Sequence, residues 1–155
     1  DRQIDLAREN IAWAADRAAE AGAEVLIEAI NTFDNGPVLV STTRAATDLI
    51  AQIGRPNVRI QYDVYHMQRM EGNLVATLRN RIAEIGHIQI ADSPGRGEPG
   101  TGEINYGYVL DEIDRLGYSG YVGLEYNPTT PTTEESFGWL AAVRRGTAPA
   151  QTRRV

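Results

Sequence analysis

The chain has 155 residues, a formal net charge of -6 at pH 7 and no cysteine. The acidic balance argues against binding to a nucleic-acid backbone, which needs clustered Lys and Arg. The absence of cysteine excludes disulfides, thiolate nucleophiles and zinc ribbons. No apolar run approaches the ~20 residues that span a bilayer, and no signal peptide is visible. We therefore expect a cytoplasmic globular domain without a membrane or nucleic-acid partner.

Helical and strand-like segments alternate along the chain. The longer segments repeat apolar residues at helical spacing, and the shorter ones are apolar runs with the length of a buried strand. In chain order we expect a helix over 3–21, a strand over 25–30, a helix over 43–53, a strand over 58–63, a helix over 74–85, a strand over 87–91, a helix over 106–116, a strand over 121–126 and a last helix opened by Thr133 and Glu134. This order indicates βα units and a parallel sheet. Residues 1–145 would form part of one domain, and 146–155 a flexible tail.

Turn and cap residues mark the predicted helix boundaries. Ser41 or Thr42 can cap the second helix, and Asn73 and Asn105 can cap the third and the fourth. A glycine stands where each of the first four helices should end: Gly22, Gly54, Gly86 and Gly117.

Side chains alternate across a strand, so each predicted strand has two faces. One face is entirely aliphatic and requires cover by helices: Val25, Ile27, Val58, Ile60, Ile88, Ile90, Val122 and Leu124. The other face is polar, with a carboxylate or an amide near the end of each strand: Glu28, Asp63, Gln89 and Glu125. Parallel strands end at one shared edge, where α/β folds place ligands, so we expect these four side chains to converge. The alternative is an amphipathic sheet with one solvated face, as in antiparallel folds; the βα order argues against it.

The four convergent side chains form a hard oxygen donor set. Three carboxylates and an amide oxygen suit Mg²⁺ or Mn²⁺ better than a thiophilic metal. Three buried carboxylates would also repel one another, and a divalent cation is the simplest compensation. Each acid alone has a second interpretation as a hydrogen-bond partner of a loop. The metal site is predicted from all four together.

Two histidines lie near the predicted strands. His66 follows Asp63 by three residues and can reach the same pocket. It is a candidate metal ligand, a candidate hydrogen-bond donor to a substrate oxygen, or a structural residue, and the sequence leaves all three open. His87 lies at the opposite end of its strand, and we expect it to be structural.

The loop over 95–100 matches the pattern GxGxxG without forming a dinucleotide site. Pro99 lies inside the pattern, the next helix starts only after Asn105, and Glu98 would repel a pyrophosphate. We expect a flexible active-site loop that presents Arg96 to a substrate carboxylate in a bidentate contact. The alternative is a solvated loop charge.

Five segments resemble the hydroxypyruvate isomerases of the xylose isomerase-like TIM-barrel superfamily. They correspond to the fifth strand, the sixth strand with its loop, the seventh strand, the loop after it, and the eighth strand: residues 26–31, 60–72, 86–92, 96–106 and 123–126. The resemblance implies a (β/α)₈ TIM barrel, of which this chain supplies about four βα units, strands five to eight, plus a preceding helix. It also implies the roles of six side chains, namely metal binding by Glu28, Asp63, Gln89 and Glu125, acid/base chemistry by Glu28 and Glu125, and substrate contact by His66 and Arg96.

The reaction implied by the resemblance is an intramolecular oxidoreduction. Hydroxypyruvate and 2-hydroxy-3-oxopropanoate (tartronate semialdehyde) would interconvert through an enediolate that a divalent metal stabilises. One Glu would take a proton from the carbon next to the carbonyl, and a proton would return to the neighbouring carbon. This chemistry belongs to glyoxylate and carbohydrate metabolism, and a homo-oligomer is an expected assembly.

The sequence leaves three rival classes of function to consider. A related sugar epimerase or a 2-oxo-tetronate isomerase would use the same carboxylates with a different pocket. A nuclease of the endonuclease IV type would need more metal-binding histidines than the two present. A half-barrel without catalytic activity, acting in folding or assembly, would keep the site residues, show no turnover and tend to dimerise.

Overall fold

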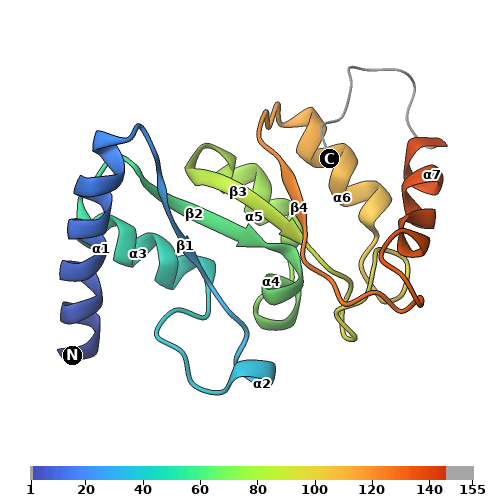
Figure 1. The fold of residues 1–155 in the computed structure, drawn as a ribbon, viewed down its shortest axis with the longest axis horizontal. Coiled ribbons are helices and arrows are strands. Elements are labelled where there is room, and N and C mark those ends of the chain that lie inside the picture. Colours follow the sequence, from blue (N-terminus) through green and yellow to red (C-terminus); the bar gives the residue numbers. More distant parts are fainter. Residues whose placement is uncertain (1, 146–155) are drawn as a thin grey trace.

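The computed structural model describes residues 2–145, which form four parallel strands and the helices between them (Figure 1). The tail predicted over 146–155 lies outside the described residues. The helices and strands have these bounds: α1 Arg2–Glu20, β1 Val25–Glu28, α2 Thr32–Asn35, α3 Thr43–Ile53, β2 Val58–Asp63, α4 Val64–Met70, α5 Leu74–Arg81, η1 Ile82–Glu84, β3 Ile85–Ile90, α6 Tyr106–Arg115, β4 Val122–Leu124, η2 Glu135–Phe137 and α7 Gly138–Arg145. Within this range no helix has the length and hydropathy to cross a membrane.

The strands pair in chain order, β1-β2-β3-β4. All three pairings are parallel, which confirms the prediction of βα units. The register places Glu28 beside Gln61, and Asp63 beside Gln89. Because the strands run the same way, the polar side chains near their ends lie at one edge of the sheet.

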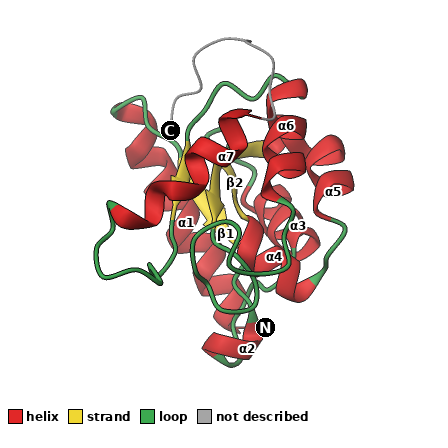
Figure 2. Ribbon diagram, turned by 90° about the vertical axis from the view of Figure 1, so that its right-hand side faces the viewer, coloured by secondary structure: helices red, strands yellow, loops and turns green. Residues whose placement is uncertain are grey.

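The aliphatic face of the sheet is the core, as the alternation predicts. Figure 2 shows α3, α5 and α6 on one side of the strands. Ile60, Ile88 and Ile90 are fully buried there, against Leu78 of α5 and Ile113 of α6. A second cluster joins β1 and β2 to α1 and α3. Burial of one such side chain contributes about 1.5–3 kcal/mol, so this face anchors the sheet.

Most predicted helix boundaries are confirmed. Thr42, rather than Ser41, caps α3 by accepting a hydrogen bond from Ala45 N at 3.1 Å. Asn105 caps α6 through Tyr108 N at 3.2 Å. Gly54 closes α3 in the left-handed conformation, with φ of 64°.

The predicted position of the end of the third helix is wrong. The α-helix α5 stops at Arg81, a 3₁₀ turn follows, and β3 already starts at Ile85. Gly86 therefore lies inside the strand, where an added Cβ would be 2.6 Å from Leu26 Cδ2, so it permits close packing and does not terminate a helix. Asn73 is the N-cap residue of α5, as predicted, but its backbone is left-handed, with φ of 50°, and its side chain makes no capping hydrogen bond.

The structure also adds elements and shortens others. The short helices α2 and α4 were not predicted, and β1 and β4 end earlier than expected. The last helix is a 3₁₀ turn from Glu135 followed by α7 from Gly138. The helix α4 begins directly after β2 because Asp63 caps it, accepting from His66 N at 3.1 Å.

Candidate functional site

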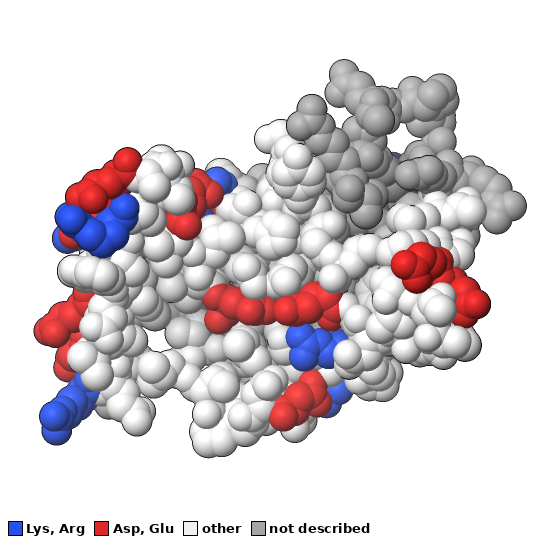
Figure 3. Space-filling view, in the orientation of Figure 1, with Lys and Arg blue, Asp and Glu red and all other residues white. Residues whose placement is uncertain are grey.

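Four titratable side chains meet at the carboxyl edge of the sheet. Oxygen or nitrogen atoms of Glu28, Asp63, His66 and Glu125 all lie within 4.8 Å of one another. Glu28 ends β1, Asp63 ends β2, His66 lies in the first turn of α4, and Glu125 follows β4. Figure 3 shows acidic side chains gathered in the middle of one face of the molecule, beside basic ones. The structure thus brings together three of the four predicted metal-site residues with the predicted His66.

Asp63 uses its two oxygens differently. Oδ1 caps α4. Oδ2 is buried and has no hydrogen-bond partner among the described residues, and Glu28 Oε1 is likewise buried without such a partner. Burial, with nearby Glu28 and Glu125, raises the pKa of Asp63 to about 7. Burial, followed by the charge of Glu125, also raises the pKa of Glu28. Oxygens arranged in this way fit a hard divalent cation, which would neutralise their mutual repulsion.

His66 is buried between the loop after β1 and the carboxylates. Its Nδ1 lies 3.2 Å from the backbone nitrogen of Asn31, and its Nε2 lies 3.8 Å from Glu28 Oε1. Burial, then the charge of Arg96, lowers the pKa of His66 to about 4. The ring is therefore neutral at pH 7.

Gln89 lies on β3 next to Asp63. Its Oε1 accepts a hydrogen bond from Nε2 of Gln61, a residue of the polar face to which the sequence analysis gave no role. The amide oxygen proposed as a metal ligand is thus held by its neighbour on β2. On the same strand, His87 packs against β4, where a Cβ at Gly123 would lie 2.8 Å from His87 Nε2.

Arg96 lies at the site and is not a solvated loop charge. Its Nη2 donates to Glu125 Oε2 at 2.9 Å, and its guanidinium lies 5.3 Å from the centre of the Tyr65 ring. The backbone of Arg96 is left-handed, with φ of 56°. A substrate carboxylate would have to share or replace Glu125 as its partner.

Two buried acids hold the loop that carries Arg96, although we expected this loop to be flexible. Asp92 accepts hydrogen bonds from four backbone nitrogens, those of Ser93, Gly100, Gly102 and Ile104. Glu98 accepts two from Thr129, in the loop after β4. The sequence signal for Asp92 was an acid directly after a strand and before a glycine-rich loop.

A second polar network, which the sequence analysis missed, lies behind His66. Tyr65 donates its hydroxyl to Asp34 at 2.5 Å, and Asn31 Nδ2 donates to the same carboxylate at 3.0 Å. Arg69 Nη2 lies 3.6 Å from Asp34 Oδ1, and the guanidinium carbon of Arg69 lies over the Phe33 ring, 5.2 Å from its centre. These groups link the loop after β1 to α4.

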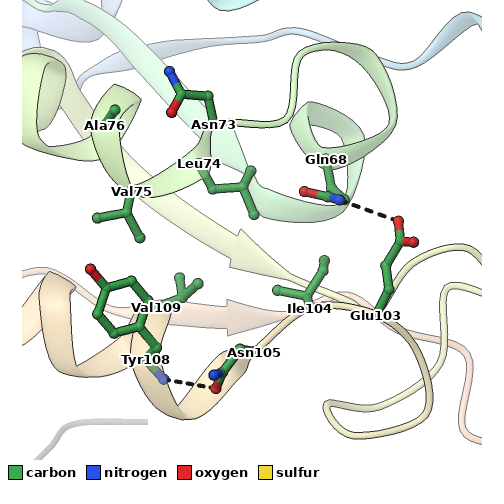
Figure 4. Close-up of a pocket in the computed structure, with 10 residues that line it drawn as sticks. All are labelled: Gln68, Asn73, Leu74, Val75, Ala76, Glu103, Ile104, Asn105, Tyr108 and Val109. Carbon is green, nitrogen blue, oxygen red and sulfur yellow. Dashed lines mark hydrogen bonds between the residues drawn. The ribbon is translucent and has the colours of Figure 1, made fainter.

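The hollow drawn in Figure 4 does not coincide with the carboxylates. It has a volume of about 300 Å³ and lies between the starts of α5 and α6, with Gln68 and Glu103 hydrogen-bonded at 3.2 Å on its rim. A second hollow lies between α1 and the loop before α3.

Comparison with known proteins agrees with this fold. Residues 1–143 match the family described as xylose isomerase-like TIM barrel. The chain belongs to this family. The fold class expected from the sequence is confirmed, and the four-stranded parallel sheet is consistent with a partial xylose isomerase-like barrel.

Relatives within the xylose isomerase-like family are named as isomerases. The chain is 48% identical over 136 residues to hydroxypyruvate isomerase of Escherichia coli (strain K12), covering 88% of this chain and 52% of that protein. It is 43% identical over 132 residues to 2-oxo-tetronate isomerase of Cupriavidus necator, covering 85% and 50%. The chain thus spans about half the length of the curated relatives it matches.

Solved structures agree on the fold. A protein described as AP endonuclease, family 2, from Brucella melitensis has a TM-score of 0.86 and 38% identity, covering 92% of this chain and 55% of that one. The apo form of 3-keto-D-glucoside 4-epimerase from E. coli has a TM-score of 0.83 and 25% identity, covering 92% and 53%.

Proposed function

We propose that this chain carries the metal-binding and acid/base residues of an isomerase that interconverts hydroxypyruvate and 2-hydroxy-3-oxopropanoate. The observation that carries the proposal is the meeting of Glu28, Asp63, His66 and Glu125 within 4.8 Å at the carboxyl edge of the strands. The identity to curated hydroxypyruvate isomerases supports the choice of substrate. Residues 1–145 are proposed to be part of one barrel domain.

The proposed ligands of the metal are Glu28, Asp63, Gln89 and Glu125. The unpartnered oxygens of Glu28 and Asp63 support a cation between them, and oxygen donors suit Mg²⁺ or Mn²⁺. A bound divalent ion would supply Lewis acidity that stabilises negative charge on the substrate oxygens.

Glu28 and Glu125 are the proposed acid/base pair. One carboxylate removes a proton from C3 of hydroxypyruvate, and the C–H electron pair becomes the double bond of an enediolate. A proton is then delivered to C2, while the hydroxyl proton moves from O3 to O2, so that an aldehyde replaces the alcohol. Carboxylate oxygens within 4.8 Å of one another can serve both carbons of so small a substrate.

Arg96 and His66 are the proposed substrate-binding residues. The guanidinium of Arg96, held over Tyr65 and beside Glu125, suits a planar carboxylate. His66 is neutral and buried at the same edge, where it can contact a substrate oxygen.

A second candidate is isomerisation of 2-oxo-tetronate, supported by relatives of that name at 43% and 42% identity. The same proton transfers apply, and the two substrates differ in the length of the chain to be accommodated. A related epimerase or a half-barrel without activity would be recognised by the absence of both turnovers. A cytoplasmic setting, a role in glyoxylate metabolism and a homo-oligomer stay predictions.

The deciding experiment is turnover of hydroxypyruvate with and without Mg²⁺ or Mn²⁺. Product is read through added tartronate semialdehyde reductase and NADH, and 2-oxo-tetronate is tested in parallel. Glu125→Gln should abolish turnover. Glu84→Gln is the matched control, because Glu84 pairs with Arg81 at the other end of the strands. A folded protein without metal-dependent turnover of either substrate would refute the proposal.

A further inference from the structure

The two ring nitrogens of His66 face different partners. Nδ1 lies 3.2 Å from the backbone nitrogen of Asn31 and 2.7 Å from its side-chain Nδ2. Nε2 faces the carboxylate site, 3.8 Å from Glu28 Oε1. Asn31 is completely buried and His66 is 2% exposed. Because both residues are buried, water does not compete for these contacts, and the neighbouring protein groups determine which ring nitrogen carries the hydrogen.

Asp34 fixes the orientation of the Asn31 amide. The backbone nitrogen of Asp34, which can only donate, lies 2.9 Å from Asn31 Oδ1, so the atom in that place must be the amide oxygen. The other amide atom is then Nδ2, which donates to Asp34 Oδ2 at 3.0 Å. The atom that faces His66 Nδ1 is thus a donor.

Two donors therefore converge on Nδ1 of His66. A backbone N–H and an amide NH₂ can share a nitrogen only if that nitrogen carries a lone pair. In a neutral imidazole the hydrogen is then on Nε2, the nitrogen that faces the site. The contacts of Asn31 determine the tautomer of the ring.

We propose that Asn31 is a positioning residue that holds His66 in the Nε2–H tautomer, so that the ring donates a hydrogen bond to a substrate oxygen and does not ligate the metal. A metal ligand needs a bare nitrogen. Nδ1 is occupied by Asn31 and Nε2 carries hydrogen, which leaves donation as the role of His66. The substrate acceptor in this inference rests on the proposed function, whereas the tautomer rests on the contacts of Asn31 alone.

The network behind Asn31 keeps this arrangement rigid. The Asp34 carboxylate that orients the amide also accepts from the Tyr65 hydroxyl at 2.5 Å and lies near Arg69. Tyr65 and His66 are consecutive residues of α4, with ring centres 5.3 Å apart. The same helix thus carries the imidazole and the group that anchors its partner.

The test reads the tautomer directly from ¹⁵N-histidine-labelled protein at pH 8, where an imidazole of ordinary pKa is neutral. Long-range ¹H–¹⁵N correlations distinguish a protonated ring nitrogen from a bare one. The chain has two histidines, so a His87→Gln variant assigns the signals. Asn31→Ser keeps an oxygen that can cap α2 but removes the Nδ2 donor. Asn31→Asp keeps the cap and presents an acceptor to Nδ1.

We expect a bare Nδ1 and a protonated Nε2 in the wild type. Asn31→Ser, which keeps only the backbone donor to Nδ1, should show a smaller excess of the Nε2–H tautomer, and Asn31→Asp should have Nδ1–H as the major tautomer. Asn35→Asp is the matched control, because it makes the same charge change four residues away and, among the described residues, the Asn35 side chain is hydrogen-bonded only to the Asn31 carbonyl; it should keep the wild-type tautomer. A wild type with hydrogen on Nδ1, or variants at Asn31 with a wild-type spectrum, would overturn the inference. If Asn31→Asp does not fold, Asn31→Ser decides. Failure of the proposed function would appear as absent turnover and would leave the inference about the His66 tautomer intact.

Discussion

Glu98 and Thr129 join the loop after β3 to the loop after β4. The buried Glu98 carboxylate accepts from the Thr129 backbone nitrogen at 2.9 Å and from its hydroxyl at 2.7 Å. Arg96 lies two residues before this link, and its carbonyl accepts from Asn127 N at 2.8 Å. The position of the Arg96 guanidinium relative to Glu125 therefore depends on contacts outside the site.

Thr129→Val should weaken substrate binding more than it slows turnover. The change removes a hydrogen bond to a buried charge, a contact worth about 1.5–3 kcal/mol, and loosens the loop that holds Arg96. We expect a rise of several-fold in KM for hydroxypyruvate with a smaller change in kcat. Steady-state kinetics check this, with Thr130→Val as control because the Thr130 hydroxyl bonds only Thr132 O among the described contacts. An unchanged KM would show that the link does not position Arg96.

The Glu98 carboxylate should make the free energy of unfolding depend on pH in the acidic range. Its hydrogen bonds to Thr129 lower its pKa from the ordinary 4.5. The stabilisation is thus complete above 4.5 and is lost as the pH falls through the lowered value, since the unfolded chain then binds the proton first. Urea unfolding of the wild type and Glu98→Gln from pH 6 to pH 3 should show the two free energies of unfolding converging at low pH. A constant difference would contradict this account.

Asp63→Asn should separate helix capping from metal binding. Asn is as good a cap as Asp, so α4 should survive, while one ionic ligand is lost. We expect affinity for Mn²⁺ to fall by at least the 10–100-fold typical of losing an outer-shell partner. Titration calorimetry with Mn²⁺ measures this, and circular dichroism monitors the fold. Asp48→Asn, on the exposed face of α3, should bind Mn²⁺ as the wild type does.

Gly102→Ala should destabilise the Arg96 loop. An added Cβ would lie 2.0 Å from the carbonyl oxygen of Ser93 and 2.7 Å from Asp92 Oδ1, so the backbone must move. Overpacking of this kind costs about 1–3 kcal/mol. The free energy of unfolding in urea should fall by that amount, whereas Gly95→Ala, with nothing within 4 Å of its Cβ, should change it little. Equal effects of the two changes would rule out the steric explanation.

Leu78→Ala tests the core that supports the sheet. The side chain is fully buried against the aliphatic face, and such truncations cost about 2–5 kcal/mol. Equilibrium unfolding should register this loss. Leu6→Ala, at a side chain that is 56% exposed, should stay within about 0.5 kcal/mol of the wild type.

The sequence was sufficient to predict the sheet and the convergence of acids at its edge. Period-two alternation assigns Glu28 and Asp63 to the polar face whatever the loops do, and βα order makes the strands parallel. The same reasoning could not find α4, because Val64 to Met70 follow β2 without a turn and only the Asp63 cap marks the start of the helix.

The contacts of His66 depend on tertiary structure. Asn31 and His66 are 35 residues apart, and nothing in the local pattern of either residue indicates that they meet. Asp92 and Glu98 likewise accept hydrogen bonds across loops whose conformation no periodicity specifies. The sequence therefore predicts which residues reach the edge of the sheet, whereas their orientation comes from long-range hydrogen bonds.

The two oxygens of Asp63 have separate roles, and this limits which insertions and deletions the family can accept in and after β2. One oxygen starts α4 and the other faces the site, so the length of β2 is tied to both. Adding or removing one residue in this strand would turn Asp63 toward the aliphatic face and rotate the helix that carries His66. Length changes should therefore be found in the outer loops, such as the segment between α2 and α3, and be rejected between Val58 and His66.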